Sequence, residues 1–130
     1  MPAVSEYVLD ASALLALLNA EKGADLVQSL LPQCVISTVN LAEIVTRLSA
    51  AGMPGDQLRD ALAYLGLEII PFEEEQAFQA GLFYVQTQPF GLSLGDRACL
   101  ALARTTGATA LTSDRAWKDL EIGVEIRLIR

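Results

Sequence analysis

Short apolar runs alternate with longer amphipathic segments along this chain. The short runs have the length and composition of buried strands, whereas the longer segments repeat their apolar positions with helical spacing. We expect strands at residues 7–9, 34–37, 67–70, 109–112 and 125–129. We expect helices at residues 12–19, 23–31, 38–51, 54–65, 73–86 and 93–105, and a loop at 87–91. This alternation predicts a three-layer α/β/α fold, in which helices cover both faces of a mostly parallel sheet of four to five strands.

The length of 130 residues suits one domain, and no internal repeat or interdomain linker interrupts the pattern. The two cysteines, Cys34 and Cys99, lie far apart in apolar runs, which indicates buried thiols in a reducing compartment. The longest uncharged apolar stretch, residues 11–20, is too short to span a bilayer. No signal-peptide pattern begins the sequence. We therefore expect a single domain over residues 1–130 of a cytoplasmic protein that does not associate with membranes.

The amino-acid composition excludes several binding modes and catalytic mechanisms. Nine basic and 16 acidic side chains give a net charge of −7, which argues against nucleic-acid binding through a broad basic face. The sequence contains no histidine, and this excludes Ser-His-Asp and Cys-His catalysis, zinc fingers and the helical metalloprotease motif. Any chemistry must therefore come from carboxylates, hydroxyls or lysine.

Two acids lie at the ends of predicted strands. Asp10 follows the first strand and Asp114 comes just after the fourth. Because the carboxyl ends of parallel strands meet at one edge of a sheet, we expect both side chains at the edge where α/β proteins bind ligands. Helix capping is the alternative: Asp10 or Ser12 would cap the first helix, and Asp114 would cap a turn through Trp117.

Asp96 lies on the apolar side of its helix. It shares that face with Cys99, Leu100 and Ala103, at spacings of three, four and seven residues. An inward-facing carboxylate is costly without a partner, and a metal ion would supply one. A capping box with Ser93 is the alternative, and such a box is compatible with a role in a site.

Glu43 is ambiguous from the pattern alone. It lies opposite the apolar face of its helix, beside Asn40 and Arg47. A surface Glu43–Arg47 pair, four residues apart, is the ordinary interpretation. The same polar face would also point to the predicted edge of the sheet, since this helix follows a strand directly.

A set of carboxylates without His or Cys ligands favours Mg²⁺ or Mn²⁺ over zinc. Three or four carboxylates that hold such ions suit the hydrolysis of phosphodiester bonds, because the metal lowers the pKa of the attacking water and neutralises charge on the phosphate. The hydroxyls of Ser12, Thr112 and Ser113 flank the acids and would orient them, or would serve only in turns and caps.

Four ordered segments around these acids carry a family resemblance. They read VLDASALLAL, STVNLAEIVTRL, LSLGDRACLALA and LTSDRAW, and together they extend over essentially the whole chain. The chain resembles the PIN-domain ribonucleases, in particular the VapC-type toxins of bacterial type II toxin–antitoxin modules.

The resemblance implies roles for individual residues. Asp10, Glu43, Asp96 and Asp114 would form the metal site, with Asp10 and Asp96 as principal ligands and Glu43 acting directly or through water. Ser12 and Thr112 match supporting hydroxyl positions, and Asn40 matches a polar position on the helix that carries Glu43. Gly95 stands where similar sequences more often have Ala, and we expect this difference to affect the start of the helix but not the chemistry.

The same resemblance implies a Mg²⁺- or Mn²⁺-dependent endoribonuclease toxin that forms a homodimer. Such proteins cleave structured RNA at single-stranded loops and leave a 3′-hydroxyl and a 5′-phosphate. A cognate antitoxin would wrap the toxin with its C-terminal tail, in a groove formed by the helices at residues 23–31 and 38–65. The four site acids account for more than half of the net negative charge, so the acidity favours metal-bridged contact with phosphate and a basic peptide as inhibitor.

Two alternatives remain. A phosphatase on a related α/β scaffold commonly carries a second Asp two residues after its nucleophile, and this position is Ser12 here. A catalytically inactive PIN-fold binding module would keep the fold without binding metal. Acidic surface residues such as Asp119 and the run Glu73–Glu75 are expected to be solvated.

Overall fold

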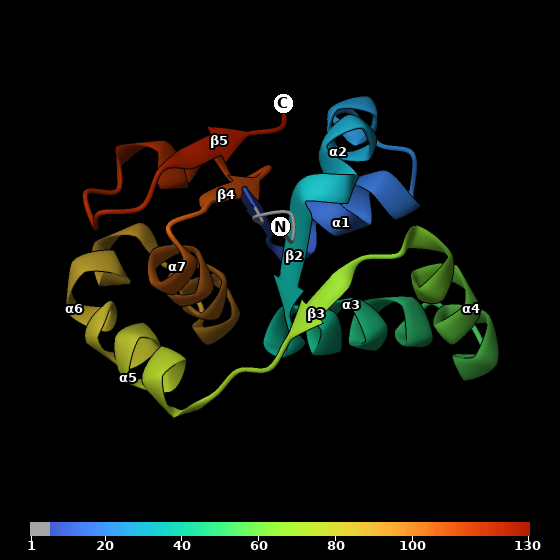
Figure 1. Cartoon of the computed structure of the whole chain (residues 1–130), viewed down its shortest axis with the longest axis horizontal. Coiled ribbons are helices and arrows are strands. Elements are labelled where there is room, and N and C mark those ends of the chain that lie inside the picture. Colours follow the sequence, from blue (N-terminus) through green and yellow to red (C-terminus); the bar gives the residue numbers. More distant parts are fainter. Residues whose placement is uncertain (1–5) are drawn as a thin grey trace, which may run out of the picture.

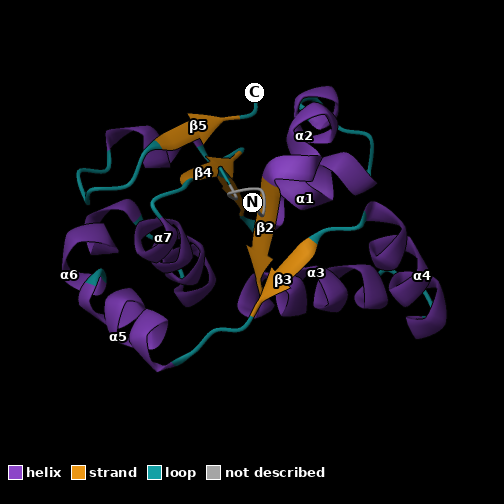
Figure 2. Ribbon diagram, in the orientation of Figure 1, coloured by secondary structure: helices purple, strands orange, loops and turns teal. Residues whose placement is uncertain are grey.

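The computed structural model describes residues 6–130, which form a five-stranded parallel sheet with helices on both faces (Figures 1 and 2). The strands are β1 (Tyr7–Leu9), β2 (Cys34–Ser37), β3 (Glu68–Ile70), β4 (Thr109–Thr112) and β5 (Ile126–Leu128). The helices are α1 (Ala11–Leu18), α2 (Ala24–Leu30), α3 (Thr38–Ala50), α4 (Gly55–Leu65), α5 (Glu74–Leu82), α6 (Tyr84–Thr87) and α7 (Leu94–Thr106). Three short 3₁₀ turns are η1 (Leu31–Gln33), η2 (Gln88–Phe90) and η3 (Arg115–Asp119). The predicted α/β class and parallel sheet are confirmed.

Alternate residues of the strands point to two separate cores. Val8 of β1 packs with α5 and α7 on one face, whereas the next residue, Leu9, packs with α1 to α4 on the other. Val35 and Ile36 of β2 divide in the same way. Because the residues of the three central strands, β1, β2 and β4, are covered on both faces, these strands contain few polar side chains, which explains their apolar runs.

The strand order places the candidate site. Along the sheet the order is β3-β2-β1-β4-β5, so the chain first builds outward from β1 in one direction and then continues on its other side at β4. The strand order therefore reverses between β1 and β4, the point at which open α/β sheets form a crevice at their carboxyl edge. Leu9 pairs with Leu111, and this register brings Asp10 beside Thr112.

One predicted helix is divided. The segment predicted as a single helix at residues 73–86 forms α5 and α6, which are separated at Phe83. The Phe83 side chain is buried, whereas Leu82, Tyr84 and Val85 around it are exposed. The buried residues Gln76, Ala80, Phe83 and Thr87 nevertheless keep helical spacing across the division, so both helices bury the same face. The predicted loop at 87–91 contains η2, and the turn predicted from Asp114 through Trp117 is part of η3.

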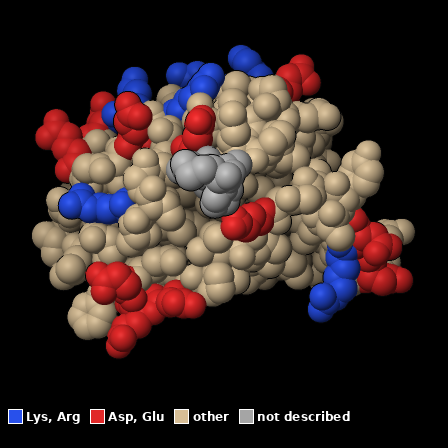
Figure 3. Space-filling model, viewed as in Figure 1, with Lys and Arg blue, Asp and Glu red and all other residues tan. Residues whose placement is uncertain are grey.

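The surface agrees with the charge analysis. On the face shown in Figure 3, Lys and Arg side chains are scattered among Asp and Glu and form no broad basic surface. Asp119 and Glu73–Glu75 are exposed, as predicted, and Cys34 and Cys99 are buried free thiols. Within residues 6–130, none of the helices has the length and apolar character needed to cross a membrane.

Candidate active site

Asp10 is buried at the carboxyl end of β1, where it also caps α1. Its side chain is 4% exposed and accepts three hydrogen bonds. Oδ1 accepts from Ser12 Oγ at 2.7 Å and from the Ala13 backbone N–H at 2.8 Å, and Oδ2 accepts from Thr112 Oγ1 at 2.6 Å. The predicted capping role of Asp10 is therefore confirmed, and these contacts fix the carboxylate in one orientation.

Two hydroxyls join the ends of β1 and β4 around this carboxylate. Thr112 Oγ1 donates to Asp10 and accepts the backbone N–H of Asp114 at 3.0 Å. Ser12 Oγ also donates to Asp10 and accepts the backbone N–H of Ser113 at 3.0 Å. Ser12 and Thr112 thus hold the acid and the loop after β4 together, in the supporting positions that the sequence predicted.

In the absence of a cation, the environment of Asp10 raises the pKa of its carboxyl group and so shifts it toward the neutral form. Burial raises the pKa of Asp10 from 3.8 to about 6, against the hydrogen bonds from Thr112, Ser12 and Ala13, which lower it; the nearby charge of Asp96 raises it further. The only ion pair among residues 6–130 joins Arg130 to Glu21, so no Lys or Arg in the described chain neutralises Asp10. The site therefore holds a desolvated carboxylate without a counter-ion.

Asp96 is half-buried in the first turn of α7 and completes a capping box. Its Oδ2 accepts the Ser93 N–H at 2.9 Å, and its own N–H is donated to Ser93 Oγ at 3.2 Å. The box is therefore present, as the sequence allowed, and it holds the carboxylate at the start of the helix. Burial raises the pKa of the Cys99 thiol well above its usual value, and the negative charges of Asp10, Asp96 and Glu43 add to this effect. The charges of these three acids, from three different parts of the chain, therefore all act on the buried Cys99.

Glu43 turns toward α7 rather than toward solvent. Asn40 Nδ2 donates to Glu43 Oε1 at 2.8 Å and to the backbone carbonyl of Gly95 at 3.0 Å. No Glu43–Arg47 ion pair occurs, so the surface-pair interpretation is wrong. The reason is the buried Asn40, 1% exposed, which offers a directed donor that a flexible surface arginine does not match.

Gly95 makes this position of Glu43 sterically feasible. A Cβ atom at residue 95 would lie 2.5 Å from Glu43 Cδ and 2.6 Å from Oε2, and closer still to Oε1. Gly95 therefore matters beyond the start of the helix, because this glycine lets the Glu43 carboxylate lie against the first turn of α7, and the expectation that it does not affect the chemistry stays a prediction. A glycine within an amphipathic helix was the signal in the sequence, since such residues often mark close contacts.

Asp114 lies at the exposed rim of the site. Its Oδ1 accepts the Ala116 N–H at 3.0 Å and caps η3, in agreement with the predicted turn. The Trp117 N–H is donated to its backbone carbonyl at 3.2 Å. Asp114 is connected to Asp10 only through its backbone N–H and Thr112, and its carboxylate is directed to its own turn rather than to the other acids.

The donor set fits a hard divalent cation. Asp10, Glu43, Asp96 and Asp114 offer only carboxylate oxygens, and the buried Asn40 Oδ1 has no hydrogen-bond partner among the described residues. In their present orientations, no three His, Cys, Asp or Glu side chains of residues 6–130 are grouped closely enough to hold an ion. Asp96, Glu43 and Asp114 instead direct oxygens to Ser93, Asn40 and Ala116.

Comparison with known proteins assigns the family. The family model described as PIN domain matches residues 7–123, nearly the whole chain. The chain belongs to the PIN domain family, and the resemblance found in the sequence is confirmed. No curated protein matches it.

Solved structures share the fold at low sequence identity. DNA-bound VapBC from Salmonella typhimurium is similar with a TM-score of 0.76 and 16% identity, and the match covers 96% of this chain and 98% of that one. VapBC2 from Rickettsia felis, bound to a promoter DNA fragment, is similar with a TM-score of 0.74 and 19% identity. This match covers 94% of this chain and 97% of that one. A toxin–antitoxin complex from Klebsiella pneumoniae is similar with a TM-score of 0.70 and 19% identity, and the match covers 93% of this chain and 100% of that one.

Replacement of Asp10 by Asn is expected to stabilise the metal-free protein at neutral pH. The folded-state pKa of about 6 lies above the ordinary 3.8, so the folded wild type loses stability as the pH rises from about 4 to about 6. This loss amounts to about 3 kcal/mol at 1.36 kcal/mol per pKa unit. Asn has the same shape without the charge.

Urea unfolding in EDTA should therefore show Asp10→Asn more stable than wild type at pH 8, with a difference that disappears near pH 4. A less stable variant at pH 8 would contradict the proposed burial cost.

Replacement of Gly95 by Ala tests whether this glycine positions Glu43. Ala alone favours a helix by about 0.5–1 kcal/mol over Gly, and Gly81→Ala in α5, where nothing lies within 4 Å of the new methyl group, should show that gain. In wild type, Gly95→Ala should instead be neutral or destabilising, because Glu43 must move. In a Glu43→Ala background, where no carboxylate has to move, Gly95→Ala should again increase the stability of the protein. Equal effects of Gly95→Ala in both backgrounds, measured by chemical unfolding, would show that the two residues are not coupled.

Proposed function

We propose that this PIN domain is the toxin of a toxin–antitoxin pair and acts as a metal-dependent endoribonuclease. One observation carries the proposal: Asp10 is buried and rigidly held without a counter-ion, with the charge of Asp96 near it. A buried carboxylate that is costly for stability is typical of a functional site. The fold shared with the VapBC structures supports the toxin assignment.

In this proposal, Asp10 and Asp96 are the principal ligands of Mg²⁺ or Mn²⁺. Glu43 binds directly or through water, and Asp114 completes the cluster from the rim. When bound, the cation would stabilise the negative charge that builds on the phosphate during hydrolysis. Ser12 and Thr112 keep both Asp10 oxygens in a fixed orientation, and Asn40 does the same for Glu43.

The proposed substrate is RNA, and the proposed partner is a cognate antitoxin. An apolar groove of about 560 Å³ lies between α3 and α4 and is lined by Leu41, Val45, Leu58 and Leu62. It continues to Ile69 on β3, the edge strand of the sheet. We assign the antitoxin tail to this groove. The helix predicted at residues 23–31 does not line it, because α2 packs Val27 into the core.

We further propose that the protein is a homodimer and that residues 1–130 form one cytoplasmic domain. Exposed apolar side chains on α5 and α6, among them Phe78, Leu82 and Val85, offer a surface for a second copy. The free, buried thiols Cys34 and Cys99 suit a reducing compartment.

The proposed nuclease should cleave RNA only with a divalent cation. Purified protein is incubated with total bacterial RNA and Mg²⁺, and the new RNA ends are sequenced. We expect discrete cleavage sites with 5′-phosphate ends, which disappear with EDTA. Asp10→Asn and Asp96→Asn should each lower the rate by about two orders of magnitude or more, because each removes a charged ligand oxygen.

Asp119→Asn serves as the matched control, since Asp119 is an exposed acid at the end of η3 and takes no part in the site network. Its cleavage rate should equal that of wild type. Full activity in both site variants, or undiminished cleavage in EDTA, would overturn the metal-site assignment. Absence of cleavage together with absence of metal binding would favour the inactive binding module.

The antitoxin groove is tested by a charge placed on its wall. Val45 is 36% exposed and lines the groove, so Val45→Glu should leave the fold intact and weaken association with the co-expressed small protein of the neighbouring open reading frame. Tyr64→Glu is the control, because Tyr64 is 90% exposed on α4 and lies outside the lining. Loss of co-purification in Val45→Glu alone supports the assignment, whereas equal association of both variants contradicts it.

A further inference from the structure

A second, polar depression of about 420 Å³ adjoins the acidic site. Ser12 and Ser113 line one end of it, and these are the residues that connect Asp10 to the loop after β4. Asn19, Arg47 and Arg130 line the remainder together with Glu21 and three apolar side chains. The depression therefore extends from the two serines beside Asp10 to two guanidinium groups.

The two arginines differ in their freedom. Arg130 is fixed, because its Nη1 lies 3.7 Å from Glu21 Oε1 and donates to the Lys22 carbonyl at 3.1 Å. Arg47 is exposed on α3 and forms no ion pair with any residue of the described chain. Glu43, four residues earlier on the same helix, would be the usual ion-pair partner of Arg47, but it accepts a hydrogen bond from Asn40 instead. Arg47 thus presents a positive charge without an ion-pair partner to the depression that Ser12 and Ser113 border.

The chemistry of this depression suits a phosphate group. Guanidinium groups bind phosphate oxygens with paired, charge-assisted hydrogen bonds, and the Asn19 amide and the serine hydroxyls are further donors. No aromatic side chain lines it, so it offers no surface on which a base would stack. A basic peptide would be repelled by Arg47, whereas an RNA backbone that enters the metal site would be attracted.

We propose that this depression is a subsite for a backbone phosphate of single-stranded RNA that flanks the cleaved bond, with Arg47 as its main contact. The inference rests on the proposed ribonuclease function and extends it. Such a subsite would resolve the conflict between a net charge of −7 and an RNA substrate, because the attraction is local. It would add affinity without sequence preference, since phosphate contacts position the chain and do not read bases.

The test separates binding from cleavage. Binding of a fluorescent oligouridylate is measured by anisotropy in EDTA, where no cleavage occurs, over a range of salt concentrations. Arg47→Gln should weaken binding by about three- to tenfold and reduce the slope of log affinity against log salt by about 0.7, the value for one phosphate contact on a single strand. Arg47→Lys should recover most of the affinity, because it restores the charge.

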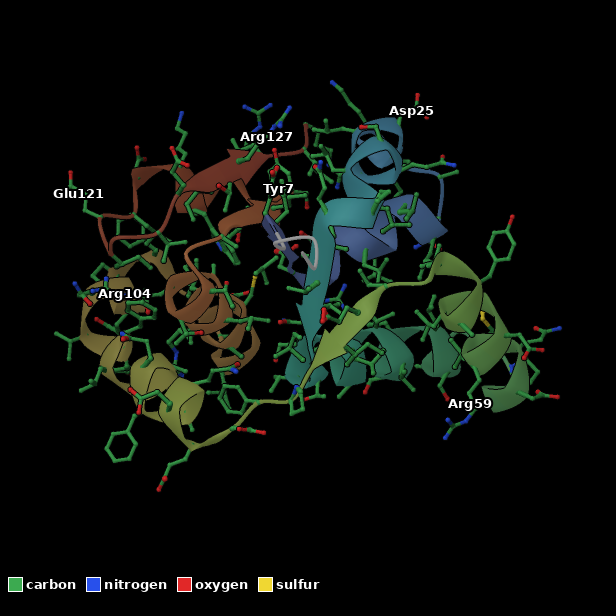
Figure 4. All side chains as sticks on the ribbon, viewed as in Figure 1. Tyr7, Asp25, Arg59, Arg104, Glu121 and Arg127 are labelled. Atoms are coloured by element: carbon green, nitrogen blue, oxygen red, sulfur yellow. The ribbon has the colours of Figure 1, made fainter. Side chains whose placement is uncertain are left out.

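Arg127→Gln is the matched control. Arg127 is exposed on β5, an edge strand of the sheet, its side chain reaches toward Tyr7 (Figure 4), and it does not line the depression. This variant removes the same charge and should leave binding unchanged. In Mg²⁺-dependent cleavage of total RNA, Arg47→Gln should raise the RNA concentration needed for half-maximal rate and leave the maximal rate within about twofold of wild type.

The outcomes distinguish the subsite from the nuclease. If Arg47→Gln and Arg127→Gln bind and cleave alike while Asp96→Asn is inactive, the subsite is overturned and the nuclease stands. If no protein cleaves RNA but Arg47→Gln alone weakens oligouridylate binding, the subsite stands and the nuclease fails. If Arg47→Gln weakens only the association with the antitoxin, the depression belongs to the protein partner and the proposal is overturned.

Discussion

The hydrogen bond from Thr112 to Asp10 is the contact on which the site depends. It crosses from β4 to β1 at the point where the strand order reverses, and it is buried at both ends. Parallel pairing of Leu9 with Leu111 sets its geometry, so the register of the sheet determines the position of the carboxylate. The two helix layers then keep water away, which raises the pKa of Asp10 to about 6 and makes a bound cation favourable.

The candidate ligands have a second task, because they also hold the local fold. Asp10 caps α1, Asp96 completes the capping box of α7, and Asp114 caps η3. Helix starts provide unpaired N–H groups that carboxylates satisfy, and they favour negative charge. Capping and function are therefore not competing explanations here. The caps use one oxygen each of Asp96 and Asp114 and leave the other for a ligand, whereas both oxygens of Asp10 already accept hydrogen bonds.

The sequence predicted local features well and contacts between elements poorly. The strands at residues 7–9, 34–37 and 109–112 have the predicted bounds, because runs buried on both faces are apolar throughout. The contact of Glu43 with Asn40 and Gly95 was not predictable from helical periodicity, since it depends on how closely α3 approaches α7. The break at Phe83 was not predictable either, because the buried positions on its two sides keep one continuous helical spacing.

Titration of the metal-free protein with Mn²⁺ at pH 6, followed by calorimetry in buffers of different ionisation enthalpy, tests the central claim most directly. At this pH about half of the Asp10 side chains carry a proton that a bound cation must displace. The account predicts saturable binding with release of about half a proton per site, and Asp10→Asn should abolish the proton release and weaken binding. Absence of saturable binding in the wild type, or binding that is unchanged in Asp10→Asn, would contradict it.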